Sequence, residues 1–124
     1  MTVKASREGL PGQKTASGYI IDNVVPFVAL PSAGALGKFV RISNPLTGKR
    51  AIAIVLDVGP WNEHDDAYVF FGERPAAESG KSMSGKGTNK AGIDLGEKIW
   101  RQLGMTDNTD VAWSFIDEIT TLTT

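Results

Sequence analysis

The sequence predicts one small all-β domain with one or two short helices. Its 124 residues are 41% apolar, which is enough to bury a single core but too little for two. Fourteen glycines and six prolines are spread along the chain without a period, as expected for many turns that join short strands. Cysteine is absent, so the fold must hold by packing, without disulfides or thiolate metal sites.

The strand pattern begins after a polar lead-in. Residues 1–17 are polar and contain glycine, which predicts a flexible N-terminal segment, and a first strand is expected at 18–21. The folded domain is then expected to span residues 18–118, and the threonine-rich residues 119–124 predict a frayed end.

Four further short strands are expected from the apolar runs. The run at 24–30 contains one proline and is closed by another, which favours an edge strand or a bulged one. Residues 38–43 are rich in β-branched and aromatic side chains, and the turn residues 44–49 join them to 50–56 in a hairpin. Because 50–56 is almost uniformly apolar, this arm is expected in the middle of the sheet. A short strand is also expected at 67–71.

The second half contains a long loop, one helix and a last strand. Residues 72–92 include five glycines and almost no large apolar side chain, which predicts a long surface loop without secondary structure. An apolar stripe at helical spacing predicts a helix at 95–103, with Asp94 as its N-cap and Glu97 completing a capping box. The aromatic run at 111–116 predicts the last strand.

Charge and hydropathy exclude several classes of function. The net charge is −1, with thirteen basic and fourteen acidic residues, so the chain lacks the basic excess of a nucleic-acid binder, and we expect no nucleic-acid partner. No apolar run is long enough to span a bilayer, and residues 1–18 contain no segment typical of a signal peptide. Either the protein is cytosolic or the chain begins after an excised leader.

Two segments resemble the RlpA-like double-psi β-barrel family. Residues 40–49, followed by an apolar strand into D-V-G-P-W at 57–61, are similar to the family pattern V-x-V-T-N-x-x-N-G-K … V-x-V-N-D-R-G-P-[FW]. The G-I-D-L-G run at 92–96, which leads into a helix ending in Leu-Gly, is similar to its I-D-L-S and L-G elements. Order and spacing agree across roughly residues 18–116. The resemblance implies a six-stranded double-psi β-barrel with a groove that holds long glycans.

The resemblance also implies a function at the cell envelope, without a cofactor. Its members include lytic transglycosylases that act on peptidoglycan and non-hydrolytic, wall-loosening expansins. The catalytic aspartate of the transglycosylases corresponds to Asp57, and the aspartate that matters in expansins corresponds to Asp94. We therefore expect a glycan-cleaving domain of the lytic-transglycosylase kind. The alternatives are a non-catalytic glycan-binding or wall-loosening module and a structural part of a larger assembly.

The residues themselves allow both functional and structural interpretations. Asp57 ends an apolar strand, where burial would raise its pKa and suit it to general acid/base catalysis; alternatively, it only bonds the turn that follows. Asp94 either caps the helix or assists in the site. Trp61 either fills the core or stacks on a sugar ring, and Tyr68 is a second candidate for stacking.

Further candidates come from the loops. His64 is the only histidine, and it lies either in an exposed loop or in the groove as a proton donor or acceptor. A metal site is not expected there, because consecutive residues on one loop rarely converge on one ion. The family's catalytic histidine corresponds to Phe27, so Arg74 and Glu78 are candidate replacements in a rebuilt groove. Asn89, in the long loop, is a candidate contact for glycan hydroxyls.

Overall fold

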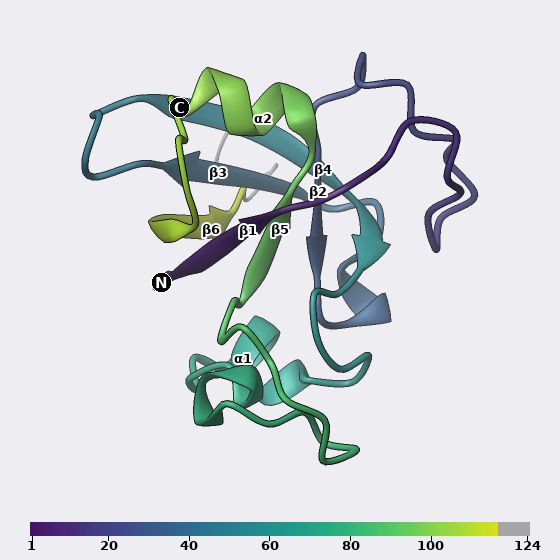
Figure 1. Ribbon diagram of the computed structural model, residues 1–124, viewed down its shortest axis with the longest axis vertical. Helices are drawn as coiled ribbons and strands as arrows, with labels where there is room; N and C mark the ends of the chain where they lie inside the picture. Colours follow the sequence, from purple (N-terminus) through teal and green to yellow (C-terminus); the bar gives the residue numbers. More distant parts are fainter. Residues whose placement is uncertain (117–124) are drawn as a thin grey trace.

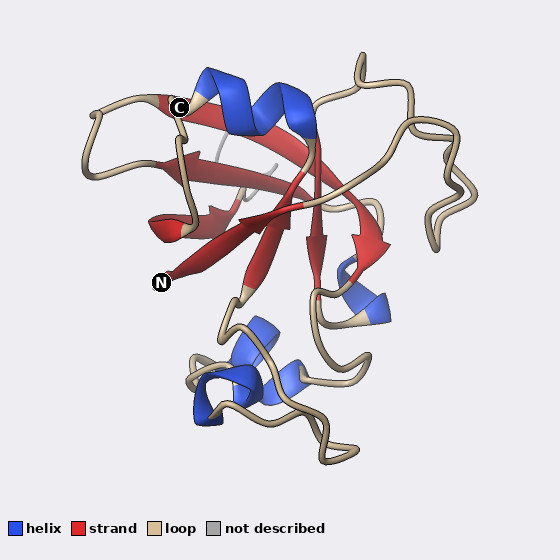
Figure 2. Cartoon of the chain, viewed as in Figure 1, coloured by secondary structure: helices blue, strands red, loops and turns tan. Residues whose placement is uncertain are grey.

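The protein is a closed β-barrel with short helices at its ends (Figures 1 and 2). This computed structural model describes residues 1–116. The strands close in the order β1-β5-β2-β4-β3-β6, so the predicted six-stranded barrel is confirmed. They are β1 (Thr2–Arg7), β2 (Phe27–Leu30), β3 (Phe39–Ser43), β4 (Arg50–Val58), β5 (Ile93–Leu95) and β6 (Thr109–Phe115). The helices are α1 (Asp66–Phe71), α2 (Glu97–Gln102) and the 3-10 turns η1 (Ala33–Ala35) and η2 (Ala76–Ser79).

The core fills the barrel with alternate residues of every strand. In β4, the inward side chains Ala51, Ala53 and Val55 are buried, whereas the intervening Ile52 is 54% exposed. This alternation follows from the two-residue repeat of a β-strand. Helix α2 packs against β4, β2 and β5 and contributes Ile99 to the same core. Side chains on the outer face of the barrel, such as those of Phe39 and Ile52, lie between these inward residues and are exposed.

The central hairpin matches the sequence prediction. Strands β3 and β4 pair antiparallel, with Ser43 opposite Arg50, and β4 lies between β3 and β2. The register between β2 and β4 shifts between Val28 and Ala29, but the extra residue lies in β4, so the bulge predicted for β2 belongs to its partner strand. Strand β2 is not an edge strand, since it pairs with both β4 and β5.

Several predictions at the element level are wrong. Residues 1–17 are not wholly a flexible lead-in, because Thr2–Arg7 form β1, which pairs with β5 and β6. Residues 18–21 form no strand, and Ile20 makes only an isolated bridge. The expected strand at 67–71 is helix α1, with Tyr68 and Val69 buried on one face.

The predicted helix cap is also wrong. Helix α2 begins at Glu97 with Gly96 as its N-cap, and Asp94 belongs to β5. The long loop at 72–92 is present but contains η2. The expected fray at 119–124 lies outside the described residues. No helix within residues 1–116 is long and apolar enough to cross a membrane.

Candidate functional site

Four residues on neighbouring strands form a row on the outer face of the barrel. Ser6 of β1 lies opposite Asp94 of β5, and Ala29 of β2 lies opposite both Asp94 and Asp57 of β4. Paired residues on adjacent strands project from the same face of a sheet. The two neighbours of Asp94 in β5 belong to the core, so Asp94 itself points outward. We call these four residues the carboxylate row.

A β-bulge places Asp57 in this row. Val55 faces the core opposite Val28, whereas the next pair along the strands is Ala29 with Asp57. Leu56 is therefore the extra residue of β4. Without it, the alternation of the strand would turn Asp57 toward the barrel interior. The bulge brings the two aspartates to either side of one small side chain.

Glu8 is a third carboxyl group at the row. It follows β1, and its N–H donates to the carbonyl of Leu95 at 2.9 Å, which continues the parallel pairing. It lies two residues after Ser6 and so projects from the same face. The Glu8 and Asp57 carboxyl groups lie near enough for a hydrogen bond between them to shift the pKa values of both. Oε2 of Glu8 is buried and has no hydrogen-bond donor among the described residues, which favours the protonated form of this side chain.

Residues 9–26 form a covering segment that folds over part of this face. Its Ala16 N–H donates to Oδ1 of Asp57 at 2.8 Å. The ring of Tyr19 packs edge-on against Phe27 of β2, with ring centroids 5.5 Å apart. Phe27, which the sequence resemblance aligned with a catalytic histidine, is fully buried and packs against Tyr19. The carboxyl groups of the row are consequently only partly open to solvent.

The pKa of Glu8 is raised from its ordinary value of 4.5 to about 9. Burial is the largest cause, followed by the hydrogen bond to Asp57 and the negative charges of Asp57 and Asp94. Glu8 therefore holds a proton at neutral pH and donates it in the hydrogen bond to Asp57.

The two aspartates differ from Glu8 and from each other. Burial acts to raise the pKa of Asp57, but hydrogen bonds from Glu8 and from the N–H groups of Ala16 and Val58 outweigh it, and the pKa is lowered. Burial raises the pKa of Asp94 to about 6; the Ser6 hydroxyl acts against this shift and the charge of Asp57 adds to it. The site thus combines a protonated acid, an ionised carboxylate and a group that titrates slightly below neutrality.

The structure brings together the predicted pair Asp57 and Asp94, but it changes their roles. The predicted raised pKa of Asp57 is wrong, because three hydrogen-bond donors stabilise its ionised form. Glu8 was missed, since it falls within residues predicted to be a flexible lead-in. The alternation of Val3 and Ala5 with polar neighbours is the signal that places Glu8 on the outer face of a strand.

Trp61 and Asn89 contact each other beyond the end of β4. The indole N–H of Trp61 donates to Oδ1 of Asn89 at 2.7 Å, and the Trp61 ring is half-buried. His64 is exposed, and its backbone bridges Ser32. Within residues 1–116, no hydrogen bond or ion pair connects the His64 side chain to the carboxylate row.

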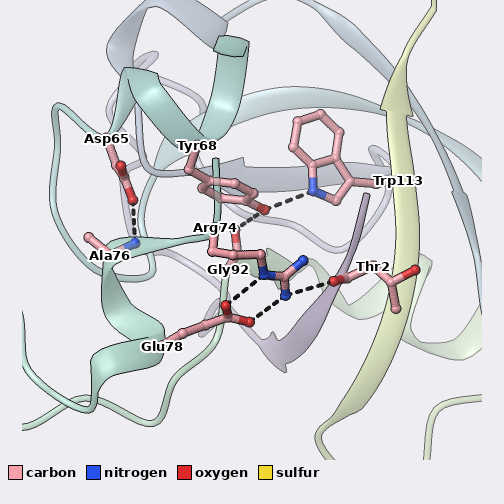
Figure 3. A network of polar contacts seen from close by, with 8 residues as sticks. All are labelled: Thr2, Asp65, Tyr68, Arg74, Ala76, Glu78, Gly92 and Trp113. Atoms are coloured by element: carbon pink, nitrogen blue, oxygen red, sulfur yellow. Dashed lines mark hydrogen bonds and ion pairs between the residues drawn. The ribbon is translucent and has the colours of Figure 1, made fainter. Parts of the chain in front are cut away.

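The remaining candidates belong to a structural network on the α1 side of the barrel (Figure 3). Tyr68 is 1% exposed, donates to the carbonyl of Gly92 and accepts from the indole of Trp113, so its prediction as a sugar platform is wrong. Arg74 and Glu78 form a two-bond ion pair, and Arg74 also donates to the carbonyl of residue 2. These contacts tie the long loop to β1.

The sequence matches one family model over residues 1–114, which is described as a domain of unknown function, DUF8814. The chain belongs to the DUF8814 family. No curated protein matches this DUF8814 chain in sequence.

Solved structures with similar folds are known despite low identity to this DUF8814 domain. Cerato-platanin 3 from M. perniciosa has a TM-score of 0.56 and 12% identity, with 97% of this chain and 98% of that one covered. The Streptomyces papain inhibitor has a TM-score of 0.53 and 18% identity, with 94% of each chain covered. A Clavibacter michiganensis expansin mutant in complex with cellohexaose has a TM-score of 0.52 and 16% identity, with 94% of this chain and 51% of that one covered. The predicted double-psi β-barrel fold is thereby confirmed for this DUF8814 domain.

Proposed function

We propose that this domain cleaves glycosidic bonds in a cell-wall polysaccharide, with peptidoglycan strands as the first candidate. The observation that carries the proposal is the position of the partly buried Glu8 beside Asp57, where the pKa of Glu8 is raised to about 9 and that of Asp57 is lowered. Glycoside cleavage requires such a pair, since an acid must protonate the leaving oxygen while a carboxylate stabilises the positive charge on the sugar.

In the proposed reaction, Glu8 is the general acid. It gives its proton to the glycosidic oxygen as the bond from that oxygen to the anomeric carbon breaks, and the ionised Asp57 stabilises the oxocarbenium-like centre. In the lytic-transglycosylase variant, a hydroxyl of the same sugar then attacks the anomeric carbon and returns its proton to Glu8. Asp94 has a pKa of about 6, so above this pH it adds a negative charge near Glu8 and Asp57.

Trp61 supports a glycan as the substrate. Its half-buried ring is fixed in orientation by Asn89 and lies four residues after Asp57, past the end of β4. A fixed aromatic face covers the apolar side of a pyranose at little entropic cost. The expansin with this fold is a complex with cellohexaose, which is consistent with a glycan ligand. A polysaccharide substrate would place the protein in the cell envelope or outside the cell.

The test is incubation of the purified domain with peptidoglycan sacculi and, separately, with cellohexaose, followed by mass analysis of the soluble products. We expect fragments with anhydro ends from sacculi. Glu8→Gln should lower their release by about 10²–10⁴-fold, as expected for loss of a general acid. Glu63→Gln, a change to an exposed carboxyl, is the matched control and should keep full activity. Absence of products from the wild type on both substrates would overturn the proposed cleavage.

A non-catalytic glycan-binding module is the second candidate. The observation that favours it is that both aspartates are already engaged by donors of the protein, Asp57 by Ala16 and Val58 and Asp94 by Ser6. Such engaged carboxylates can hold the covering segment in place instead of reacting. Co-sedimentation of the wild type with sacculi that stay intact, with binding unchanged in Glu8→Gln, would favour this module.

A further inference from the structure

The outer face of the β3–β4 hairpin carries two arginines that have no role in the carboxylate row. Arg41 lies opposite Ile52, and Arg50 lies opposite Ser43. The two arginines are therefore diagonal neighbours on one face, and such positions are about 7–8 Å apart. Both side chains are exposed. We call Arg41 and Arg50 the arginine pair.

Two hollows adjoin the arginine pair, and both arginines line each of them. The larger has a volume of about 460 Å³ and is also lined by Ile52 and Gln102. The smaller has a volume of about 200 Å³ and is also lined by Ser43 and Ser114. The larger volume falls within the range of about 300–1,000 Å³ that is typical of small-molecule sites.

The arginine pair differs from the other arginines in its partners. Arg7, Arg74 and Arg101 each form an ion pair with a glutamate. Within residues 1–116, neither arginine of the pair forms an ion pair or donates a side-chain hydrogen bond. Two like charges this close on one sheet face repel each other. An anion held between them would relieve this repulsion and occupy guanidinium donors that have no acceptor in the described part of the chain.

We propose that the arginine pair binds an oxyanion, a carboxylate or a phosphate, carried by a sugar-sized ligand such as a hexuronic acid or a sugar phosphate. The planar guanidinium group matches carboxylate and phosphate oxygens with two parallel hydrogen bonds. The exposed side chain of Ile52 offers an apolar surface to the C–H face of a sugar ring. The hydroxyls of Ser43 and Ser114 line the smaller hollow and can bond sugar hydroxyls, and the Gln102 amide, whose Nε2 donates to the Arg50 carbonyl at 3.4 Å, offers its oxygen in the larger one.

This site is separate from the carboxylate row. Arg50 begins β4 and Asp57 lies near its end, seven residues later, which is roughly 23 Å along an extended strand. Binding at the arginine pair therefore requires neither Glu8 nor glycan cleavage, and a negative result at either site leaves the other unaffected.

The experiment is an NMR titration of the arginine Nε–H signals of the ¹⁵N-labelled protein. The probes are D-glucuronate, glucose 1-phosphate, inorganic phosphate and, as the neutral control, D-glucose. Arg41→Gln and Arg50→Gln assign the two signals and test their roles. Arg101→Gln is the matched control, since it removes the same charge from an exposed arginine on helix α2 that lines neither hollow.

We expect saturable shifts of both signals with at least one sugar anion and none with glucose. Each substitution of the pair should weaken binding at least tenfold, as expected for loss of a charge-assisted bidentate contact, whereas Arg101→Gln should bind normally. Tighter binding of glucuronate or of glucose 1-phosphate identifies the group that is recognised. Inorganic phosphate binding without either sugar anion would overturn a sugar-sized ligand. Absence of saturable shifts up to millimolar concentrations, or equal weakening in Arg101→Gln, would overturn the site.

Discussion

Stability should fall as the pH rises from 6 to 8, and the cause should be the proton on Glu8. Its pKa is about 9 in the folded protein and near its ordinary value of 4.5 in the unfolded chain. Between these values the folded state binds one more proton than the unfolded state. The contribution of Glu8 is thus fully present below pH 4.5 and is lost as the pH approaches 9.

The magnitude follows from the number of protons. One proton changes the free energy of unfolding by about 1.4 kcal/mol per pH unit, so the loss between pH 6 and 8 is about 2.7 kcal/mol. For a domain of this size, that corresponds to a decrease in Tm of about 10 °C. Asp94, with a pKa of about 6, adds a small further loss near pH 6.

Urea denaturation followed by tryptophan fluorescence at pH 6, 7 and 8 measures this slope. Glu8→Gln should nearly abolish it, because an amide donates a hydrogen bond to Asp57 without taking up a proton. Gln at this position should also make the protein more stable than the wild type at pH 8. His64→Gln is the control, since it removes the only histidine and should leave the slope unchanged. Equal slopes in the wild type and in Glu8→Gln would refute the assignment of the proton to Glu8.

Three further substitutions, with one glycine control, test packing and polar contacts at the site and in the network around Tyr68. Gly96→Ala should destabilise the fold by about 2–3 kcal/mol in urea denaturation, because a Cβ there would lie 2.6 Å from a ring atom and 2.8 Å from a backbone oxygen. Gly87→Ala, where the space is open, should be nearly neutral. Tyr68→Phe should cost about 1–3 kcal/mol in the same measurement, since it leaves a buried indole N–H and a carbonyl without their hydroxyl partner. Ser6→Ala should raise the pKa of Asp94 in a ¹³C NMR titration, because the donor that favours the ionised form is lost.

The sequence predicted those parts of the fold that depend on local patterns. The β3–β4 hairpin was predictable because β-branched runs flank a turn with strong turn chemistry. Strand β1 was not, since its inward residues Val3 and Ala5 are few and small, and its stability comes from pairing with β5 and β6, far along the chain. The short helix α1 was mistaken for a strand because five consecutive residues contain too little periodicity to separate the two.

The candidate site was predictable in its residues but not in its chemistry. Family resemblance identified Asp57 and Asp94, which the register places on either side of Ala29. Their pKa values depend on donors that no local pattern contains, such as the Ala16 N–H of the covering segment. Glu8 could be identified as the acid only from the pairing of β1 with β5, which places the end of β1 beside Asp94.

Phe27 connects the covering segment to the strands of the carboxylate row. Phe27 projects from the outer face of β2, where its fully buried ring packs against Tyr19, and Gly96 lies against it without space for a side chain. The ring therefore anchors the covering segment, which supplies a donor to Asp57. Packing around Phe27 thus supports the different charge states of the two carboxyl groups, because burial raises the pKa of Glu8 while the donor from the covering segment helps to keep Asp57 ionised.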